Sequence, residues 1–220
     1  MRDVVIFGAG QVAETVHWYL AEEAGRNVVA FTVDAAYRDK DAVLGVPLVD
    51  FETLTQTHPP DRCEMFVAIS YLGLNKVRAA KAAEAEAKGY TLISHASPRA
   101  MVWPGLELAP NTIIMEANVI QPFVGIGRNV ILWSGNHVGH HTTIEDDCFI
   151  ASHAVISGNC RIGQGSFIGV NATLRDNITV GARNVIGAGA LILADTPDNG
   201  VFMGQATEMS RVPSNRLRGI

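Results

Sequence analysis

Aliphatic residues recur at every sixth position through the second half of the chain. The series runs from Val102 to Ile192, and all sixteen of its members are Val, Ile or Leu. A period of six fits neither an amphipathic helix, with about 3.6 residues per turn, nor an alternating strand. It predicts a β-solenoid in which each hexad supplies one short strand and one corner, with the aliphatic side chains stacked inward. The members are Val102, Leu108, Ile114, Ile120, Ile126, Leu132, Val138, Ile144, Ile150, Ile156, Ile162, Ile168, Leu174, Val180, Ile186 and Ile192.

The fifth position of the hexad is small in many repeats. Small side chains suit an inward position beside a tight corner, so we interpret Cys148 and Cys160 as buried packing residues. The small residues are Thr142, Cys148, Ala154, Cys160, Ser166, Ala172 and Ala190.

The first 95 residues follow a different pattern, in which short apolar runs alternate with helical stretches. This alternation predicts a small parallel α/β sheet. Ser97-Pro98 marks the expected boundary, which gives a Rossmann-like domain at 1–97, a solenoid at 98–204 and a C-terminal tail at 205–220. We expect strands at 4–7, 27–33, 46–49, 65–69 and 91–94, and helices at 11–24 and 74–88.

The first turn carries a shortened dinucleotide-type fingerprint. Gly8 permits a tight turn, Gly10 allows the backbone to approach a phosphate, and Asp34 follows the second expected strand, where a ribose hydroxyl could be bound. The alternative is a turn that only packs a helix against the sheet. A full two-lobed Rossmann domain does not fit before residue 98, which argues against an NAD-dependent dehydrogenase.

Composition excludes several classes of protein. Hydrophobic residues make up 48% of the chain and charged residues 18%, which argues against disorder. The net charge of −5 gives no overall basic footprint for nucleic acid or an anionic membrane, and no apolar run is long enough to cross a bilayer. Three cysteines do not form a disulfide framework. We expect a cytoplasmic protein that binds neither nucleic acid nor membrane.

The solenoid resembles the hexapeptide-repeat acyltransferases, whose fold is a left-handed parallel β-helix of triangular cross-section. Together with the Gly8-Ala9-Gly10-Gln11 turn, the segment 45–48 (GVPL) and the segment 66–69 (FVAI), it resembles the sialic-acid O-acetyltransferase/bacillosamine N-acetyltransferase family. The pattern is closest to enzymes that act on nucleotide-linked 4-amino-4,6-dideoxysugars, such as GDP-perosamine N-acetyltransferases. The resemblance implies acetyl-CoA as co-substrate, a homotrimer, a role in bacterial surface glycan synthesis, and nucleotide-sugar binding by Gly8, Gly10, Gln11 and Asp34.

The resemblance also implies catalytic residues. The family's general base is a histidine at the hexad position of His140, and Gly158, three hexads later, lies one coil away and could offer its backbone N–H to an oxyanion. A base that titrates near neutral pH can take the proton of an attacking amine and return it to the leaving thiolate. The family places a carboxylate after this histidine, whereas this chain has His141. The alternative is that His140 is structural or positions substrate.

The group that orients His140 is left open. Asn159, stacked one coil above His141, is one candidate, and the carboxylates of Glu116, Glu145 and Asp146 are others. His141 and His153 are further possible supports. The spacing of His137, His140 and His141 also permits a zinc site, but no further ligand completes a familiar spacing, and we expect no metal.

The coenzyme is expected along a face of the solenoid. Val170 and Ala188 lie at positions that the family uses for such contacts, and Gly187 exposes backbone to a narrow pantetheine arm, as Gly158 does. Tight corners without any ligand are the alternative for each of these residues.

Three functions follow. The first is an acetyl-CoA-dependent N-acetyltransferase with a nucleotide-linked 4-amino-4,6-dideoxysugar as acceptor. The second is a sugar O-acetyltransferase of the sialic-acid type; a hydroxyl needs a stronger base than an amine does, so His141 in place of a carboxylate favours the amine. The third is a non-catalytic nucleotide-binding scaffold.

Overall fold

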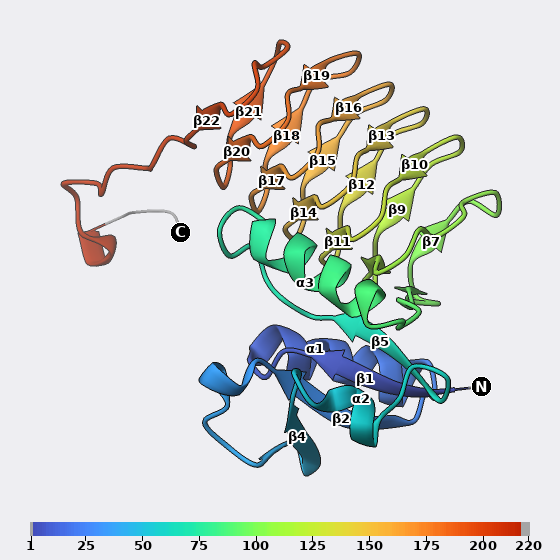
Figure 1. The fold of residues 1–220 in the computed structure, drawn as a ribbon. Coiled ribbons are helices and arrows are strands. Elements are labelled where there is room, and N and C mark those ends of the chain that lie inside the picture. Colours follow the sequence, from blue (N-terminus) through green and yellow to red (C-terminus); the bar gives the residue numbers. More distant parts are fainter. Residues whose placement is uncertain (1, 217–220) are drawn as a thin grey trace.

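The computed structural model describes residues 2–216 of the chain. Within them a small α/β domain lies beside a long stack of coils, and the stack ends in an extended C-terminal segment (Figure 1). The last four residues of the predicted tail at 205–220 lie outside the described residues. Among the helices of residues 2–216, none has the length and apolar character that crossing a membrane requires.

The N-terminal domain is built on a five-stranded sheet with the order β3-β4-β2-β1-β5. Its strands are parallel except for β3, which pairs antiparallel with β4 through a tight turn at Leu44 and Gly45. The sheet is therefore mixed at one edge. The strands are β1 (Asp3–Phe7), β2 (Val28–Val33), β3 (Ala42–Val43), β4 (Val46–Asp50) and β5 (Cys63–Val67).

Helices connect these strands. The expected first helix is divided: α1 is followed directly by a π-helical turn, η1, which re-aims the side chains of its last five residues. The expected strand at 91–94 forms only an isolated bridge, between Leu92 and Met65, before the chain enters the solenoid. The helices are α1 (Gln11–Trp18), η1 (Tyr19–Glu23), η2 (Ala35–Tyr37), α2 (Leu54–Thr57), α3 (Lys76–Ala87) and, in the tail, η3 (Ser214–Arg216).

The solenoid consists of two-residue strands that form three parallel sheets of seven, six and four strands. Each complete coil contributes one strand to each sheet, whereas the coils at the two ends lack a strand of the four-stranded sheet. Strands one coil apart pair in register, as Ile131 does with Phe149. The strands are β6 (His95–Ala96), β7 (Met101–Val102), β8 (Ile113–Ile114), β9 (Val119–Ile120), β10 (Gly125–Ile126), β11 (Ile131–Leu132), β12 (His137–Val138), β13 (Thr143–Ile144), β14 (Phe149–Ile150), β15 (Val155–Ile156), β16 (Arg161–Ile162), β17 (Phe167–Ile168), β18 (Thr173–Leu174), β19 (Thr179–Val180), β20 (Val185–Ile186), β21 (Leu191–Ile192) and β22 (Val201–Phe202).

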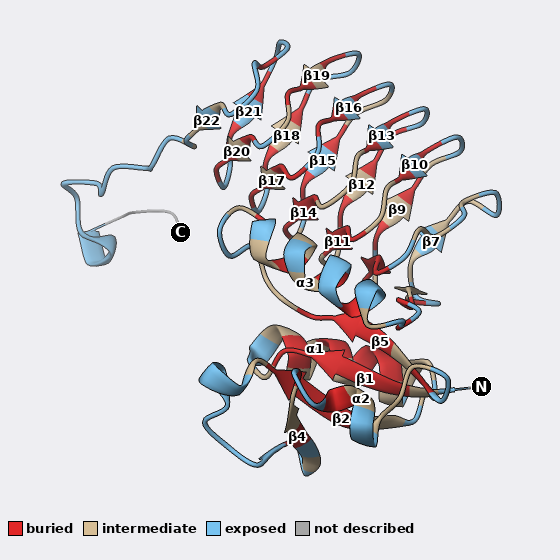
Figure 2. Cartoon of the chain, viewed as in Figure 1, coloured by how far each residue is buried: buried red, intermediate tan, exposed pale blue. Residues whose placement is uncertain are grey.

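The six-residue repeat explains this core. Every strand from β7 to β21 ends on a member of the aliphatic series, and these side chains pack in one hydrophobic cluster through the coils. Figure 2 colours much of the chain along these strands as buried. Only Leu108 of the series lies outside a strand. The small residues at the fifth hexad position are buried as predicted, and burial raises the pKa of the Cys148 thiol to about 12. Cys148 is therefore a packing residue.

Three corners separate the sheets, and their positions locate the functional residues. In one coil the first corner (133–136) joins the seven-stranded to the six-stranded sheet, and the second corner (139–142) joins the six-stranded to the four-stranded sheet. The third corner (145–148) leads back to the seven-stranded sheet. The second corner is thus the one that does not border the seven-stranded sheet.

The N-terminal domain covers the seven-stranded sheet. Outward side chains of that sheet, among them Ile131 and Phe149, share one buried cluster with Ile6 and Phe66 of the N-terminal sheet. Buried Arg78 of α3 donates hydrogen bonds to carbonyl oxygens of Asn129, Asp147 and Cys148 in the solenoid. These contacts hold the two parts in one fixed arrangement.

Candidate active site

His140 lies on the second corner and is exposed, outside the aliphatic column. Its ring covers the backbone of Gly158 in the next coil: a Cβ added to Gly158 would lie 2.8 Å from both Cε1 and Nε2 of His140. The main chains also meet here, because Asn159 donates its N–H to the His140 carbonyl at 2.7 Å. The spacing of one coil therefore brings His140 and Gly158 together.

His141 contacts the opposite edge of the His140 ring. The two Nδ1 atoms are 3.1 Å apart, and the ring planes are at 85°. His141 adopts a left-handed backbone conformation, with φ of 59°, and its ring packs on Phe123 at 4.7 Å between centroids. The sharp corner and the Phe123 contact hold His141 where it can hydrogen-bond His140.

Asn159, in contrast, does not orient the His140 ring. Its side-chain amide donates to Asn177 Oδ1 at 2.9 Å, one coil further along the same corner. Asparagine suits this position because it tolerates the left-handed conformation, and Asn159 and Asn177 both have positive φ.

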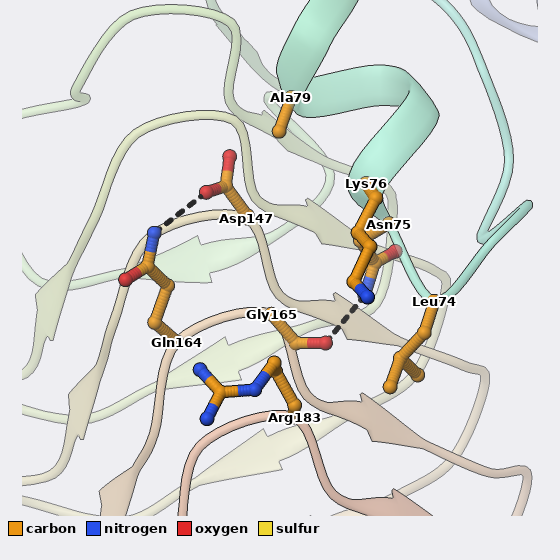
Figure 3. A pocket seen from close by; sticks show the side chains of 8 residues that line it. All are labelled: Leu74, Asn75, Lys76, Ala79, Asp147, Gln164, Gly165 and Arg183. Atoms are coloured by element: carbon orange, nitrogen blue, oxygen red, sulfur yellow. Dashed lines mark hydrogen bonds between the residues drawn. The ribbon is translucent and has the colours of Figure 1, made fainter. Parts of the chain in front are cut away.

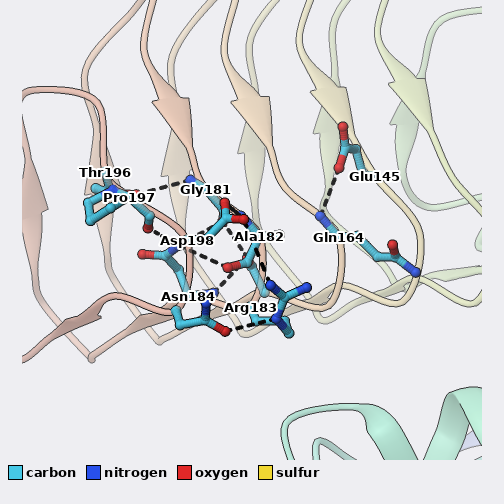
Figure 4. A network of polar contacts seen from close by, with 11 residues as sticks. Glu145, Gln164, Gly181, Ala182, Arg183, Asn184, Thr196, Pro197 and Asp198 are labelled. Carbon is cyan, nitrogen blue, oxygen red and sulfur yellow. Dashed lines mark hydrogen bonds and ion pairs between the residues drawn. The ribbon is translucent and has the colours of Figure 1, made fainter.

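The three candidate carboxylates bind other groups. Glu145 accepts hydrogen bonds from Arg161 Nε and from the Gln164 N–H on the third corner (Figure 4). Asp146 accepts the Arg128 N–H at 2.9 Å. Neither carboxylate is within hydrogen-bonding distance of His140 in the described residues, because both lie on the third corner, where Glu145 bonds the next coil and Asp146 bonds the preceding one.

Glu116 lies on the first corner, one coil before Ser134. Burial opposes ionisation of its carboxyl, but hydrogen bonds from Tyr19 and from Ser134, at 2.8 Å, outweigh that effect and lower its pKa. Burial, together with the neighbouring Glu116 carboxylate, raises the pKa of Tyr19 to about 12. Glu116 thus joins η1 to the solenoid, far around the coil from His140.

The remaining histidines lie elsewhere on the coil. His153 is on the first corner, with its ring over Gly135, and His137 points outward from the six-stranded sheet on β12. His153 is therefore not next to His140, as a supporting role would require within one copy. Among residues 2–216, no group of three or more His, Cys, Asp or Glu side chains is arranged to hold a metal ion.

The backbone N–H of Gly158 donates no hydrogen bond within the described residues. The neighbouring corner groups are used: Ser157 donates to Leu174 and Asn159 to His140. Gly158 is also partly accessible. An unused backbone donor beside an exposed imidazole can bind a developing oxyanion.

The expected coenzyme residues divide between two corners. Gly158 is on the second corner, whereas Val170, Gly187 and Ala188 follow β17 and β20 on the first corner. Val170 and Ala188 are exposed, and Gly187 is buried, where a Cβ would lie 3.1 Å from the Gly204 nitrogen. Within one chain these residues do not form a single surface.

The glycine turn lies between β1 and α1. Gly8 has a φ of 127°, and a Cβ there would lie 2.9 Å from the Ala68 carbonyl oxygen, so the turn requires glycine. Gly10 is the N-cap of α1, has open space around it and leaves the first helical N–H groups without a side-chain cap. Lys40 Nζ reaches the Ala9 carbonyl at 3.0 Å. Such a helix start suits phosphate.

Asp34 directly follows β2, as predicted, but its carboxylate has a partner. Lys81 Nζ of α3 lies 2.9 Å from Asp34 Oδ1. The backbone carbonyl of Asp34 also accepts the Tyr37 N–H at the start of η2. A ribose hydroxyl bound by Asp34 would therefore share the carboxylate with Lys81.

Sequence reasoning missed the cleft next to this turn. It has a volume of about 640 Å³ and lies between the first turns of α1, the loop after β5 and the outer face of the seven-stranded sheet. Phe149 and Phe167 are one coil apart at outward positions, a repeat that could have revealed the aromatic wall. The lining of the cleft is Gln11, Val12, Thr15, Ser70, Tyr71, Trp133, Phe149, Ala151, Ser152, Phe167 and Val170.

A second cavity, of about 250 Å³, lies where α3 begins beside the third corner (Figure 3). Lys76 and Arg183 face it together with the Asp147 carboxylate, which accepts a hydrogen bond from Gln164. This cavity is separate from both the aromatic cleft and the His140 corner.

Comparison with known proteins agrees with this fold. Residues 124–158 and 159–194 match the family model described as bacterial transferase hexapeptide (six repeats). The matched residues contain the strands from β10 to β21. A comparison with curated protein sequences gives no match.

Solved structures resemble the chain over almost its whole length. The acetyltransferase domain of PglB from Neisseria gonorrhoeae FA1090 is 29% identical, with a TM-score of 0.81 over 91% of this chain and 96% of that one. A perosamine N-acetyltransferase mutant from Caulobacter crescentus, with asparagine in place of a histidine and in complex with CoA and GDP-perosamine, is 29% identical, with a TM-score of 0.84 over 93% and 94%. WeeI from Acinetobacter baumannii AYE, 18% identical with a TM-score of 0.78 over 93% and 97%, shares the fold.

These structures confirm the fold expected from the resemblance. The chain has a left-handed parallel β-helix that follows its α/β domain, and it is an acyltransferase.

Proposed function

We propose that this transferase moves the acetyl group of acetyl-CoA to the amine of a nucleotide-linked 4-amino-4,6-dideoxysugar, with His140 as general base. The observation that carries the proposal is the second corner, where an exposed imidazole lies against a glycine whose N–H is unused. The solved relatives with CoA and GDP-perosamine support both substrates. The implied role in bacterial surface glycan synthesis is part of the same proposal.

The His140–His141 contact is compatible with the tautomer that a base needs. Two Nδ1 atoms at 3.1 Å form a hydrogen bond only when one of them carries the proton. With that proton on His140, its Nε2 is unprotonated, and Nε2 is one of the two ring atoms closest to Gly158. The geometry thus supports His140 as a base whose unprotonated Nε2 lies on the side of the unused Gly158 N–H.

The reaction follows from these two groups. The amine nitrogen forms a bond to the thioester carbonyl carbon while His140 Nε2 takes the amine proton. The carbonyl oxygen becomes an oxyanion, which the Gly158 N–H stabilises. The carbon–sulfur bond then breaks, and the proton held on Nε2 passes to the departing thiolate. The products are the N-acetylated sugar and CoA.

A second copy of the chain completes this site. The glycine turn and the cleft lie at the seven-stranded sheet and its first corner, while His140 lies on the second corner. The six-stranded sheet separates the two corners, and its outward residues include exposed Met101 and Leu191 (67% and 61%) and Val155. Packing through this apolar sheet would bring the second corner of one copy to the first corner of the next.

Such an interface joins two different surfaces, and it forms a ring when the rotation between copies closes. We propose a trimer, the number that the family resemblance implies. The arrangement would also place the coenzyme between copies, with Gly158 from one and Val170, Gly187 and Ala188 from the other. Gly8, Gly10, Gln11 and Asp34 would hold the nucleotide sugar.

An acetylation screen tests the proposal. Purified enzyme is incubated with acetyl-CoA and with GDP-, UDP- or dTDP-linked 4-amino-4,6-dideoxysugars or free sialic acid, and CoA release and acceptor mass are measured. We expect N-acetylation of at least one amino-sugar nucleotide. Acetylation of sialic acid alone would favour the O-acetyltransferase, and no transfer to any acceptor would refute an acetyltransferase of sugars.

The His140→Ala variant tests the base in the same assay. The side chain is exposed, so the variant should fold, and we expect kcat to fall by about 10²–10⁴ with little change in KM for either substrate. His58→Ala, at the end of α2 and away from both corners, is the matched control. Equal activity of His140→Ala and the wild type would exclude His140 as the base.

A further inference from the structure

The aromatic cleft has four ring side chains that are not among the expected binding residues, although Gln11 and Val170 also line it. Phe149 on β14 and Phe167 on β17 stack with centroids 5.7 Å apart and ring planes at 21°. Tyr71, from the loop after β5, packs on both rings, at 5.1 Å and 4.8 Å. Trp133 adds a fourth ring at 6.4 Å from Phe149. Together these four residues form an aromatic wall.

The polar groups of the cleft are neutral. No Asp, Glu, Lys or Arg is among its described lining residues, and the polar side chains there belong to Gln11, Thr15, Ser70 and Ser152. The indole Nε1 of Trp133 is buried without a hydrogen-bond partner within the described residues. A buried N–H without an acceptor is costly, and a ligand oxygen would satisfy it. The lining therefore offers an apolar face and neutral hydrogen-bonding groups.

The order of the strands in the N-terminal sheet indicates which end of the nucleotide sugar would lie against this wall. The glycine turn follows β1, with β2 on one side of β1 and β5 on the other. Asp34 follows β2, and Tyr71 lies in the segment after β5. A diphosphate at the start of α1 would therefore direct the nucleoside toward Asp34 and the sugar toward Tyr71.

We infer that the wall of Tyr71, Trp133, Phe149 and Phe167 is the sugar subsite, and that it selects a 6-deoxysugar by packing the C6 methyl group and the apolar face of the ring. This inference rests on the proposed function. A sugar with a hydroxyl at C6 would bury that hydroxyl against the rings of Phe149 and Phe167, which offer no hydrogen bond, whereas a methyl group gains contact with them.

The test compares two acceptors that differ only at C6. The enzyme is assayed with a nucleotide-linked 4-amino-4,6-dideoxysugar and with the 4-amino-4-deoxysugar that carries a C6 hydroxyl. We expect kcat/KM to favour the 6-deoxysugar by about tenfold to a hundredfold. Tyr71→Ala should raise the KM of the 6-deoxysugar by about tenfold, lower the preference to a few-fold, and leave the KM of acetyl-CoA unchanged.

Two further variants are controls. Tyr71→Phe keeps the ring and should behave as the wild type. Leu72→Ala removes the adjacent side chain, which is 65% exposed and does not line the cleft, and should also behave as the wild type. Tyr71 is itself 52% exposed, so its removal should leave the melting temperature almost unchanged.

Three results would overturn the inference. An enzyme that acetylates amino-sugar nucleotides without preference at C6, or a Tyr71→Ala variant that slows both acceptors by the same factor or slows neither, would remove the subsite and leave the proposed function standing. Absence of transfer to every sugar nucleotide would instead refute the proposed function, and the subsite with it.

Discussion

His140 and His141 show how much chemistry a single corner of the solenoid can supply. Adjacent residues in a regular strand point to opposite faces, whereas the left-handed conformation of His141 brings both imidazoles to one side. A neutral imidazole can accept the Nδ1 proton of His140, but it lacks the charge that a carboxylate would bring. His141 is therefore proposed as a positioning residue.

Variants of His141 distinguish its effect on the orientation of the His140 ring from the effect of a charged partner. His141→Ala should lower kcat by about tenfold, less than the ~10⁴ seen when a charged orienting partner is disabled, because a neutral acceptor contributes orientation alone. His141→Asp restores an acceptor and should recover turnover. Steady-state kinetics check both variants. Wild-type kcat in His141→Ala, or failure of His141→Asp to exceed His141→Ala, would contradict this role.

At the residue scale, the sequence predicts contacts that follow the period and misses those that depend on side-chain direction. The pairing of His140 with Gly158 follows from the stacking of one coil on the next. Asn159 occupies the expected place, but it bonds Asn177, because like residues in like conformations form a ladder along a corner. The Asp34–Lys81 contact joins residues 47 apart on different elements, and no local pattern predicts it.

At the scale of elements, the repeat determines almost the whole solenoid. Each hexad encodes one strand and one corner, so strand positions follow directly from the aliphatic series. The N-terminal domain is less predictable, because pairing there is non-local. The π-helical turn η1 has no sequence signal, yet it directs Tyr19 to Glu116 and Glu23 to the start of the solenoid. The position of α3 depends on one buried residue.

Arg78 attaches α3 to the solenoid. Its guanidinium is fully buried, burial lowers its pKa to about 10, and it remains charged at neutral pH. It donates to Asn129, Asp147 and Cys148 of the solenoid and to the Ser70 carbonyl at the edge of the cleft. The planar guanidinium donates hydrogen bonds to all of these oxygens at once, which the ammonium group of lysine cannot do.

We therefore expect Arg78→Ala to lower the free energy of unfolding by about 3 kcal/mol or more, because several buried carbonyl oxygens lose their donors. Arg78→Lys should recover only part of this loss. Lys76→Ala, on the exposed side of the same helix, is the control and should change stability by less than about 0.5 kcal/mol. Urea denaturation measures all three, and equal effects of Arg78→Ala and Lys76→Ala would show that Arg78 does not hold the helix.

At the scale of the whole molecule, a second polar cluster fixes the domains to each other. Glu23 of η1 accepts hydrogen bonds from His95, Ser97 and Arg99 at the start of the solenoid, at 2.8–2.9 Å. Burial alone would raise the pKa of the Glu23 carboxyl, but these hydrogen bonds outweigh it and lower the pKa below its ordinary value of 4.5. The contact between the two domains through Glu23 should therefore depend on pH.

The direction of the pH effect follows from the lowered pKa. Ionised Glu23 stabilises the folded chain above about pH 4.5, and this contribution is lost as the pH falls through the lower pKa of the folded state. Glu23→Gln should therefore be less stable than the wild type at pH 7, and the difference should narrow below about pH 4. Urea denaturation of the variant and the wild type at pH 7 and below about pH 4 measures this difference in stability. A difference that is the same at both would show that Glu23 ionisation does not stabilise the fold.

The division of the active site between copies is the central claim, and mixing two inactive variants tests it directly. His140→Ala removes the base. Gly10→Asp adds a negative charge where the diphosphate is expected, in open space and at an N-cap that favours aspartate, so the variant should fold. The two are co-expressed with different tags, and oligomers that contain both are purified and assayed.

If each site takes its glycine turn from one copy and His140 from the next, mixed oligomers recover activity although each variant alone is inactive. In a trimer that contains both variants, one of the three sites combines an intact turn with an intact base, so we predict about a third of wild-type turnover. If one copy held the whole site, every site would lack one component. Mixed oligomers that form but remain inactive would contradict the claim.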